Sequence, residues 1–280
     1  MLSINEVFIT MKSFLKLIIL TLFFFINGYT FGQNLSVSYE FSLSNDTIHK
    51  KQNYVLDILN QKSIFRTVLR KSSDSMISKT GLGLGYNADP FYELYFVKDL
   101  NNSVFKKPIV LPINRDKFFV KIYDKLDWKI LQETTTISNY NCQKAEVKYG
   151  DRIWTAWFTK DISIQEGPYY FYGLPGLILR IEDSNKNFIF YATEIKKLAE
   201  NSFYELDNGI EIDWKQYEKL FKEFYENPYS SIKTKGMKVV KDNGSGGYQE
   251  INYRERTREI QKMLIRNNNP IELNHKIDFK

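Results

Sequence analysis

The side chains of this chain that could carry out acid–base chemistry are mostly carboxylates. The sequence holds 33 Asp and Glu residues but two histidines and one cysteine. Three acids, Asp151, Asp161 and Glu166, surround the tryptophan-rich segment Trp154–Phe158. Two carboxyl groups that converge within about 5–10 Å in one cleft can hydrolyse glycosidic bonds. The sequence therefore allows a secreted hydrolase of envelope or nutrient polymers, with these three residues as its candidate acids.

Other reactive groups give weaker signals. His49 and His275 lie far apart and have no pattern of acidic neighbours, so we expect no metal site. Cys142 has no partner for an internal disulfide and is expected to be a small buried residue. The chain contains neither a Gly-x-Ser-x-Gly elbow nor a Gly-Lys-Ser/Thr phosphate loop. We therefore predict no cofactor.

The elements that would position these side chains are predicted to be strands. Apolar residues alternate strictly from Leu35 to Leu43, which is typical of a half-buried strand. The same pattern recurs in the ranges 54–58, 92–96, 118–122, 145–149, 177–181 and 188–192. Between Ile153 and Phe158 both faces carry apolar residues, which favours a central strand covered on both sides. Short polar links between these segments indicate an antiparallel meander.

Helical spacing is evident near the end of the chain. Asp213 can cap a helix with an aromatic stripe that stops at Asn227-Pro228, and a second helix is predicted over residues 253–266. The predicted fold is therefore α+β and mostly antiparallel β, as a twisted meander sheet or half-open barrel with C-terminal helices packed on it. We expect residues 33–280 to form a single domain, of which 201–280 is the helix-containing part.

The first 32 residues predict export. From Met11, a basic start with Lys12 and Lys16 leads into a short apolar run and small residues before Gln33. This is the layout of a signal peptide cleaved after Gly32, with the true start at Met11. We expect no transmembrane segment after cleavage and a location in the periplasm or outside the cell. No cysteine lies next to the cleavage site, so a lipoprotein is not expected.

Net charge gives a further expectation about partners. The chain has a net charge of +6 and a pI near 9.0, and the predicted last helix is rich in arginine. Interleaved Glu255 and Glu259 favour a solvated helix face with internal ion pairs. Contact with anionic outer-membrane surfaces is the alternative. We expect no nucleic-acid partner for an exported protein.

The most distinctive stretch is a hexapeptide, Gly173-Leu174-Pro175-Gly176-Leu177-Ile178. Proline presets φ for the second position of a turn, and glycine accepts the positive φ of the third position in a type II turn. We therefore expect a structural type II turn that starts a strand at Leu177. The alternative hypothesis is that this turn lines a recognition groove beside Trp154 and Trp157.

This hexapeptide resembles the motif that names the GLPGLI family, a group of secreted proteins of Gram-negative bacteria. Other positions resemble the family in the same order: Trp128, Tyr140–Ala145, Trp154–Thr159, Gly167-Pro168 and Asn269–Glu272. The resemblance covers most of the chain after residue 32. It implies no established activity, cofactor or catalytic residue, so no functional residue can be transferred.

Export, the many aromatic residues and the lack of a recognisable catalytic set lead to one main functional prediction. It is a non-catalytic envelope protein that binds an apolar or peptide-like ligand or assists an outer-membrane transporter. The predicted ligand-binding residues are Trp154, Trp157, Tyr170 and Tyr172. The alternatives are the hydrolase described above and a structural component of an outer-membrane complex, which would present a flat aromatic patch.

Overall fold

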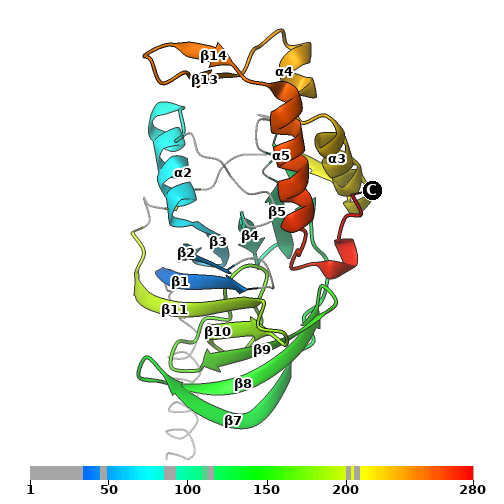
Figure 1. Ribbon diagram of the computed structural model, residues 1–280. Coiled ribbons are helices and arrows are strands. Elements are labelled where there is room, and N and C mark those ends of the chain that lie inside the picture. Colours follow the sequence, from blue (N-terminus) through cyan, green and yellow to red (C-terminus); the bar gives the residue numbers. More distant parts are fainter. Residues whose placement is uncertain are drawn as a thin grey trace, which may run out of the picture. The chain divides into compact units, whose positions relative to one another are not determined.

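The structure is a computed structural model (Figure 1), and it describes residues 34–44, 49–84, 93–109, 111, 117–199, 203–204 and 209–279. These residues belong to one compact unit, Asn34–Lys280. The predicted signal peptide, residues 1–32 with its start at Met11, lies outside the described residues. Within the described ranges, no helix combines the length and apolar character needed to cross a bilayer.

Two antiparallel meanders form the main sheet. The first consists of β1 (Leu35–Ser44), β2 (His49–Leu59), β3 (Lys62–Thr67), β4 (Phe96–Asp99), β5 (Val104–Ile109) and β6 (Phe118–Lys121). The second consists of β7 (Lys129–Ile137), β8 (Tyr140–Tyr149), β9 (Arg152–Thr159), β10 (Leu177–Asp183) and β11 (Phe188–Lys197). Pairing of β1 with β11 joins the two meanders, and β12 (Ile210–Ile212) pairs in parallel with β6. The predicted β-rich, mostly antiparallel α+β fold is confirmed.

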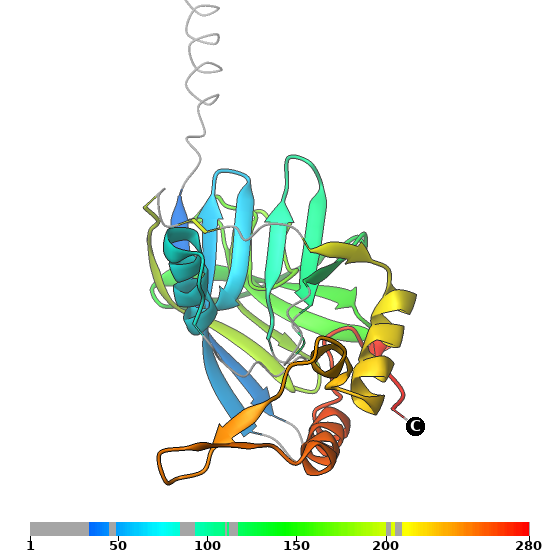
Figure 2. The same cartoon turned by 90° about the horizontal axis from the view of Figure 1, so that it is seen from above.

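The link between β6 and β7 requires the sheet to curve strongly. In the sheet order β12-β6-β5-β4-β3-β2-β1-β11-β10-β9-β8-β7, these two strands lie ten places apart. Ten strand spacings in a flat sheet would span about 48 Å. The eight steps along the chain from Lys121 to Lys129 reach at most about 28 Å. The sheet therefore bends so that its ends approach (Figures 1 and 2), but β7 and β12 do not pair and the barrel is not closed.

The alternation predicted for the first strand is confirmed. Val37, Tyr39, Phe41 and Leu43 of β1 are all buried on one face. The prediction that β9 is covered on both faces is wrong, because Ile153 on its outer face is 56% exposed. β9 does lie inside the sheet, between β8 and β10, but apolar residues on both of its faces did not mean that both faces are covered.

The helix that follows β3 has no counterpart in the predicted elements. α2 (Val68–Thr80) begins where the Thr67 hydroxyl accepts a hydrogen bond from the Arg70 backbone, and it ends at Gly81 with a φ of +75°. Its buried residues are Ser73 and Asp74, not apolar side chains. The apolar periodicity that reveals an amphipathic helix is therefore missing from this segment.

The C-terminal part has the two predicted helices and some smaller elements. These are α3 (Trp214–Glu226), α4 (Ser230–Thr234), β13 (Val240–Asp242), β14 (Tyr248–Glu250), α5 (Tyr253–Arg266) and the 3-10 helix η2 (Leu273–His275). The predicted cap at Asp213 is confirmed as a capping box with Gln216. Tyr217, Phe221 and Leu264, from α3 and α5, join the same apolar core as the sheet residues.

The loop between β9 and β10 fills the core with aromatic rings. Tyr169, Tyr170 and Phe171 are fully buried. The Tyr170 ring lies 5.4 Å from Phe96 of β4, and its other contacts include Tyr149 of β8 at 4.8 Å. Because this loop touches both meanders, it holds the two halves of the curved sheet together.

The hexapeptide turn has a different geometry from the predicted one. The Gly176 N–H donates to the Leu174 carbonyl at 2.7 Å, which closes a three-residue γ-turn around Pro175 instead of a type II turn. The predicted positive φ at Gly176 is confirmed at +155°. A Cβ there would lie 1.9 Å from the Thr159 carbonyl oxygen, so close backbone approach also requires glycine.

Candidate active site

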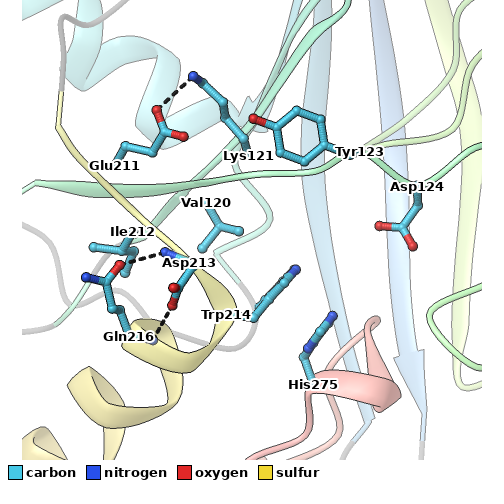
Figure 3. Close-up of a pocket in the computed structure, with 10 residues that line it drawn as sticks. All are labelled: Val120, Lys121, Tyr123, Asp124, Glu211, Ile212, Asp213, Trp214, Gln216 and His275. Atoms are coloured by element: carbon cyan, nitrogen blue, oxygen red, sulfur yellow. Dashed lines mark hydrogen bonds and ion pairs between the residues drawn. The ribbon is translucent and has the colours of Figure 1, made fainter.

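A cavity of about 650 Å³ opens where the edge of the sheet meets α3 and the C-terminal segment (Figure 3). This volume is in the range of ordinary ligand sites. Its lining comes from β6 and the residues after it, β12, the start of α3 and η2. The lining residues are Val120, Lys121, Tyr123, Asp124, Glu211, Ile212, Asp213, Trp214, Gln216 and His275.

Local structure fixes one wall of this cavity. β12 runs parallel to β6, and the Lys121 ammonium lies 2.7 Å from a Glu211 carboxylate oxygen. The chain then turns into α3, whose capping box holds Asp213 against the Gln216 backbone at 2.7 Å. Trp214 is the first residue of this helix, so the cap also fixes the position of the Trp214 backbone from which the indole extends.

Trp214 and His275 form a stacked pair at the floor of the cavity. Their ring centroids are 3.9 Å apart with an angle of 7° between the planes. Figure 3 shows the two rings side by side, with the Asp124 carboxylate pointing toward the His275 side. Burial lowers the pKa of His275 below its ordinary 6.5, although the charges of Glu272 and Asp124 oppose this shift. The imidazole is therefore neutral at pH 7 and able to accept a proton.

A buried carboxylate lies behind this pair. Glu272 is 2% exposed, and it accepts hydrogen bonds from the hydroxyls of Tyr169 at 2.6 Å and Tyr149 at 2.8 Å. The Lys107 ammonium lies 2.5 Å from its other oxygen. Burial acts to raise the pKa of Glu272, but Lys107 and the two hydroxyls outweigh it and hold this pKa below 4.5. Glu272 is thus an ionised buried group.

The four predicted ligand-binding aromatics do not share one surface. Trp154 and Tyr170 are fully buried, and Trp154 packs on Phe171 with centroids 4.6 Å apart. Trp157 lies on the opposite face of β9 from Trp154 and is half-buried, as is Tyr172. Tyr170 does contribute to the cavity indirectly, because its hydroxyl donates to the Asp124 backbone carbonyl. The ligand-binding role of these residues stays a prediction.

The three candidate acids do not converge. Asp151 and Asp161 are exposed and lie beyond opposite ends of β9, an eight-residue strand. At about 3.3 Å per residue this separates them by more than about 20 Å, beyond the range of a catalytic pair. Glu166 is buried and forms an ion pair with the Lys98 ammonium at 2.5 Å. None of the three lines the cavity.

Asp124, Trp214 and His275 were missed as a group by the sequence patterns. Asp124 and His275 are separated by more than half of the chain, and Trp214 belongs to the aromatic stripe of the helix predicted after Asp213. The available signal was the Asn269–Glu272 segment, where a glutamate ends an otherwise uncharged stretch just before His275. Among the described residues, no group of three His, Cys, Asp or Glu side chains has the arrangement of a metal site.

The sheet, its aromatic plug and the helices at its edge define a β-rich α+β domain. Residues 37–218, nearly two thirds of the chain, match a family model described as N-glycanase peptide, N-terminal domain. The chain therefore belongs to this family. The resemblance to the GLPGLI family is corrected by this match, because a hexapeptide turn and short flanking similarities are weaker than a match over the whole sheet.

Solved structures give a second comparison. Two crystal structures of PNGF-II, in space groups C2 and P21, match with 20% and 17% sequence identity and a TM-score of 0.48 each. The matches cover 67% of this chain and 32% and 33% of the solved chains, so this protein spans about a third of their length. No curated protein matches the chain.

The family match also corrects the main functional prediction. A non-catalytic envelope protein that carries an apolar or peptide-like ligand does not fit a domain of an N-glycanase family. The structure removes a physical premise of that prediction, because the rings expected to line an open apolar face pack on one another in the core. The hydrolase alternative fits the family better, although its three candidate acids do not converge in one cleft.

Proposed function

We propose that this protein is a hydrolase that processes glycans attached to protein, and that the cavity beside Trp214 is its active site. The observation that carries the proposal is the neutral His275, stacked on Trp214 in a ligand-sized cavity that Asp124 also lines, in an N-glycanase-family domain. Exposed Tyr123, together with Trp214, provides aromatic surface of the kind that orients a ligand in such pockets.

In the proposed reaction, His275 acts first as a general base. It takes a proton from a water molecule as the water oxygen bonds to the carbon of the scissile bond. The resulting imidazolium then returns this proton to the leaving atom, so the sum is addition of one water across the bond. The negative charge of Asp124 favours the protonated form of His275, which stabilises this intermediate state.

The experiment is glycan release from a labelled N-glycosylated glycopeptide, followed by mass spectrometry with the purified full chain. We expect turnover by the wild type and a loss of about 100-fold or more in kcat for His275→Gln. Asp124→Asn should also lower kcat. His49→Gln is the matched control. His49, the first residue of β2, forms a hydrogen bond with the Ser44 hydroxyl and does not line the cavity.

The outcome that would overturn this proposal is a wild-type protein that binds the glycopeptide but releases no glycan. Equal kcat values for His275→Gln and the wild type would instead remove the cavity as its site. The predicted signal peptide and an outer-membrane partner stay predictions. Export would fit the proposal, since an exported hydrolase meets glycoproteins outside the cytoplasm.

A further inference from the structure

The C-terminal segment Asn267–Phe279 lies outside the residues matched by the family model, yet it completes the cavity. The chain returns to the turn between β8 and β9, where the Leu273 backbone N–H donates to the Gly150 carbonyl at 2.9 Å. Gly150 has a φ of +59°, and a Cβ there would lie 2.6 Å from the Ile271 carbonyl oxygen. The two backbones are thus in close contact.

Arg152 holds this segment from the sheet side. Its guanidinium donates to the Asn269 side-chain oxygen at 2.6 Å, and to the carbonyls of Pro270 at 2.9 Å and Ile271 at 3.2 Å. Asp183 of β10 accepts from the same guanidinium at 3.0 Å. These bonds fix the path of the backbone, but they do not reach the imidazole three residues beyond Glu272.

Glu272 is the contact that connects this backbone to the cavity. Its carboxylate is held by Tyr149, Tyr169 and Lys107, which come from β8, the aromatic loop and β5. The Lys107 ammonium also lies 5.6 Å from the centroid of the Trp214 ring. One cation therefore contacts both the buried carboxylate and the indole on which His275 stacks.

We propose that Glu272 is the positioning residue of the cavity: through Lys107 and the two tyrosines, it fixes η2 so that His275 stacks on Trp214. This inference deepens the proposed function and depends on it for its kinetic consequence. Its structural consequence, the place of the imidazole, can be measured without any activity. Glu272 itself does not line the cavity, so its effect on a reaction would be exerted through His275.

The first measurement is the NMR signal of the His275 ring in the full chain. A face-to-face indole at 3.9 Å shifts imidazole protons strongly upfield, and Trp214→Leu identifies that shift. In Glu272→Gln we expect the upfield shift to fall by at least half. His49, the other histidine, serves as an internal reference that should not move.

The matched variants separate positioning from general loss of stability. Tyr149→Phe and Tyr169→Phe each remove one hydroxyl from Glu272 and keep the buried ring, so each should reduce the shift less than Glu272→Gln. Tyr39→Phe is the control, because its buried hydroxyl donates to the Ile178 carbonyl in another part of the core. These tyrosine variants also decide the question if Glu272→Gln does not fold.

The kinetic readout uses the same glycopeptide. If Glu272 positions His275, Glu272→Gln should lower kcat about tenfold to 100-fold and change KM less than twofold, as expected for a misplaced acid–base group. An unchanged ring shift in Glu272→Gln, or in both tyrosine variants if Glu272→Gln does not fold, would overturn the inference. A wild type without turnover would overturn the proposed function and leave the ring measurement decisive for Glu272.

Discussion

The aromatic loop between β9 and β10 and the C-terminal segment Asn267–Phe279 each contain a buried glutamate that forms an ion pair with a lysine of the sheet. The two ion pairs have different surroundings. In the loop, Lys98 binds Glu166 and also donates to the carbonyl of Gly167 at 2.8 Å. Both of its partners belong to the core. In the C-terminal segment, Lys107 binds Glu272 and lies beside the cavity. The Lys98–Glu166 pair thus stabilises the core, whereas the Lys107–Glu272 pair supports the candidate site.

The two ion pairs differ in how much of the lysine is exposed to solvent. Lys98 is completely buried, and burial lowers its pKa against the opposing charge of Glu166. The Lys107 side chain keeps 16% of its surface accessible to solvent. A buried pair that has lost one partner is strongly destabilising, whereas partial solvent access reduces that penalty. We therefore expect changes in the loop to affect stability first and changes in the C-terminal segment to affect the site first.

The largest effect is expected from Gly176→Ala in the loop. The new Cβ would lie 1.9 Å from a backbone oxygen at a φ of +155°, so the segment cannot keep its path. We expect loss of more than about 4 kcal/mol, seen as failure to fold or a much lower urea midpoint. Gly173→Ala is the control, since nothing lies within 4 Å of its Cβ and only the positive φ is strained. Equal midpoints for the two variants would contradict the structure of the turn.

The two lysines allow a direct test of the comparison. Lys98→Met leaves Glu166 buried without its cation and should cost about 3–5 kcal/mol. Lys107→Met leaves Glu272 with two tyrosine donors and should cost about 1–3 kcal/mol. Urea unfolding of both variants measures the difference. If Lys107→Met were more destabilising than Lys98→Met, the C-terminal segment would contribute more to the stability of the fold than the aromatic loop does.

Activity should depend on pH through His275. Burial places the pKa of this imidazole below 6.5, and the base must be neutral. The acidic limb of kcat/KM for glycopeptide release should therefore have its midpoint below pH 6.5 and fall about tenfold per pH unit below it. Besides burial, the charges of four groups shift the pKa of His275: Glu272, Asp124, Lys107 and Asp151. A limb above pH 7 would show that another group acts as the base.

Stability should depend on pH through Glu272. Its pKa is lower in the folded protein than the ordinary 4.5, so the unfolded chain binds more protons in acid. The stabilisation is complete above pH 4.5 and is lost as pH falls through the lowered folded value. Glu272→Gln should therefore show a flatter fall in urea midpoint between pH 5 and 3 than the wild type. Parallel curves would mean that Glu272 is not ionised in the folded protein.

The smallest effects are expected at two exposed acids, Asp151 in the turn between β8 and β9 and Asp161 at the start of the loop after β9. Asp151→Asn and Asp161→Asn should change the urea midpoint by about 0.5 kcal/mol or less. Above pH 7, where His275 is neutral, both should leave kcat within twofold, because neither residue lines the cavity and Asp151 acts on His275 only through its charge. A large loss of kcat in either variant would restore the sequence-based hydrolase site around β9.

Local patterns predicted elements that carry their own apolar signal. β1 and α3 are examples, since Val37 to Leu43 alternate and Asp213 caps an aromatic stripe. α2 was missed because its inner face is polar: Asp74 lies 2.7 Å from the buried guanidinium of Arg66. The pairing of β1 with β11 also escaped prediction, since it joins strands about 150 residues apart and no local pattern specifies such a partner.

The candidate site was less predictable than the fold. Aromatic type does not reveal whether a ring faces solvent or other rings, so Trp154 and Tyr170 were predicted to bind ligand although they lie in the core. Asp124 and His275 come to line one cavity only after the sheet has curved and the C-terminal segment has returned. Their proximity depends on long-range contacts, which residue types and spacing do not contain.

The junction of β1 and β11 has a consequence for synthesis of the chain. At about 5–20 residues per second, β11 follows β1 from the ribosome by roughly 7 to 30 s. During that interval the partner edge of β1 remains open while β2 can already pair on its other side. An open strand edge is a template for wrong pairing. The strand at the centre of the finished sheet is thus the one that must be shielded longest while the protein is being made.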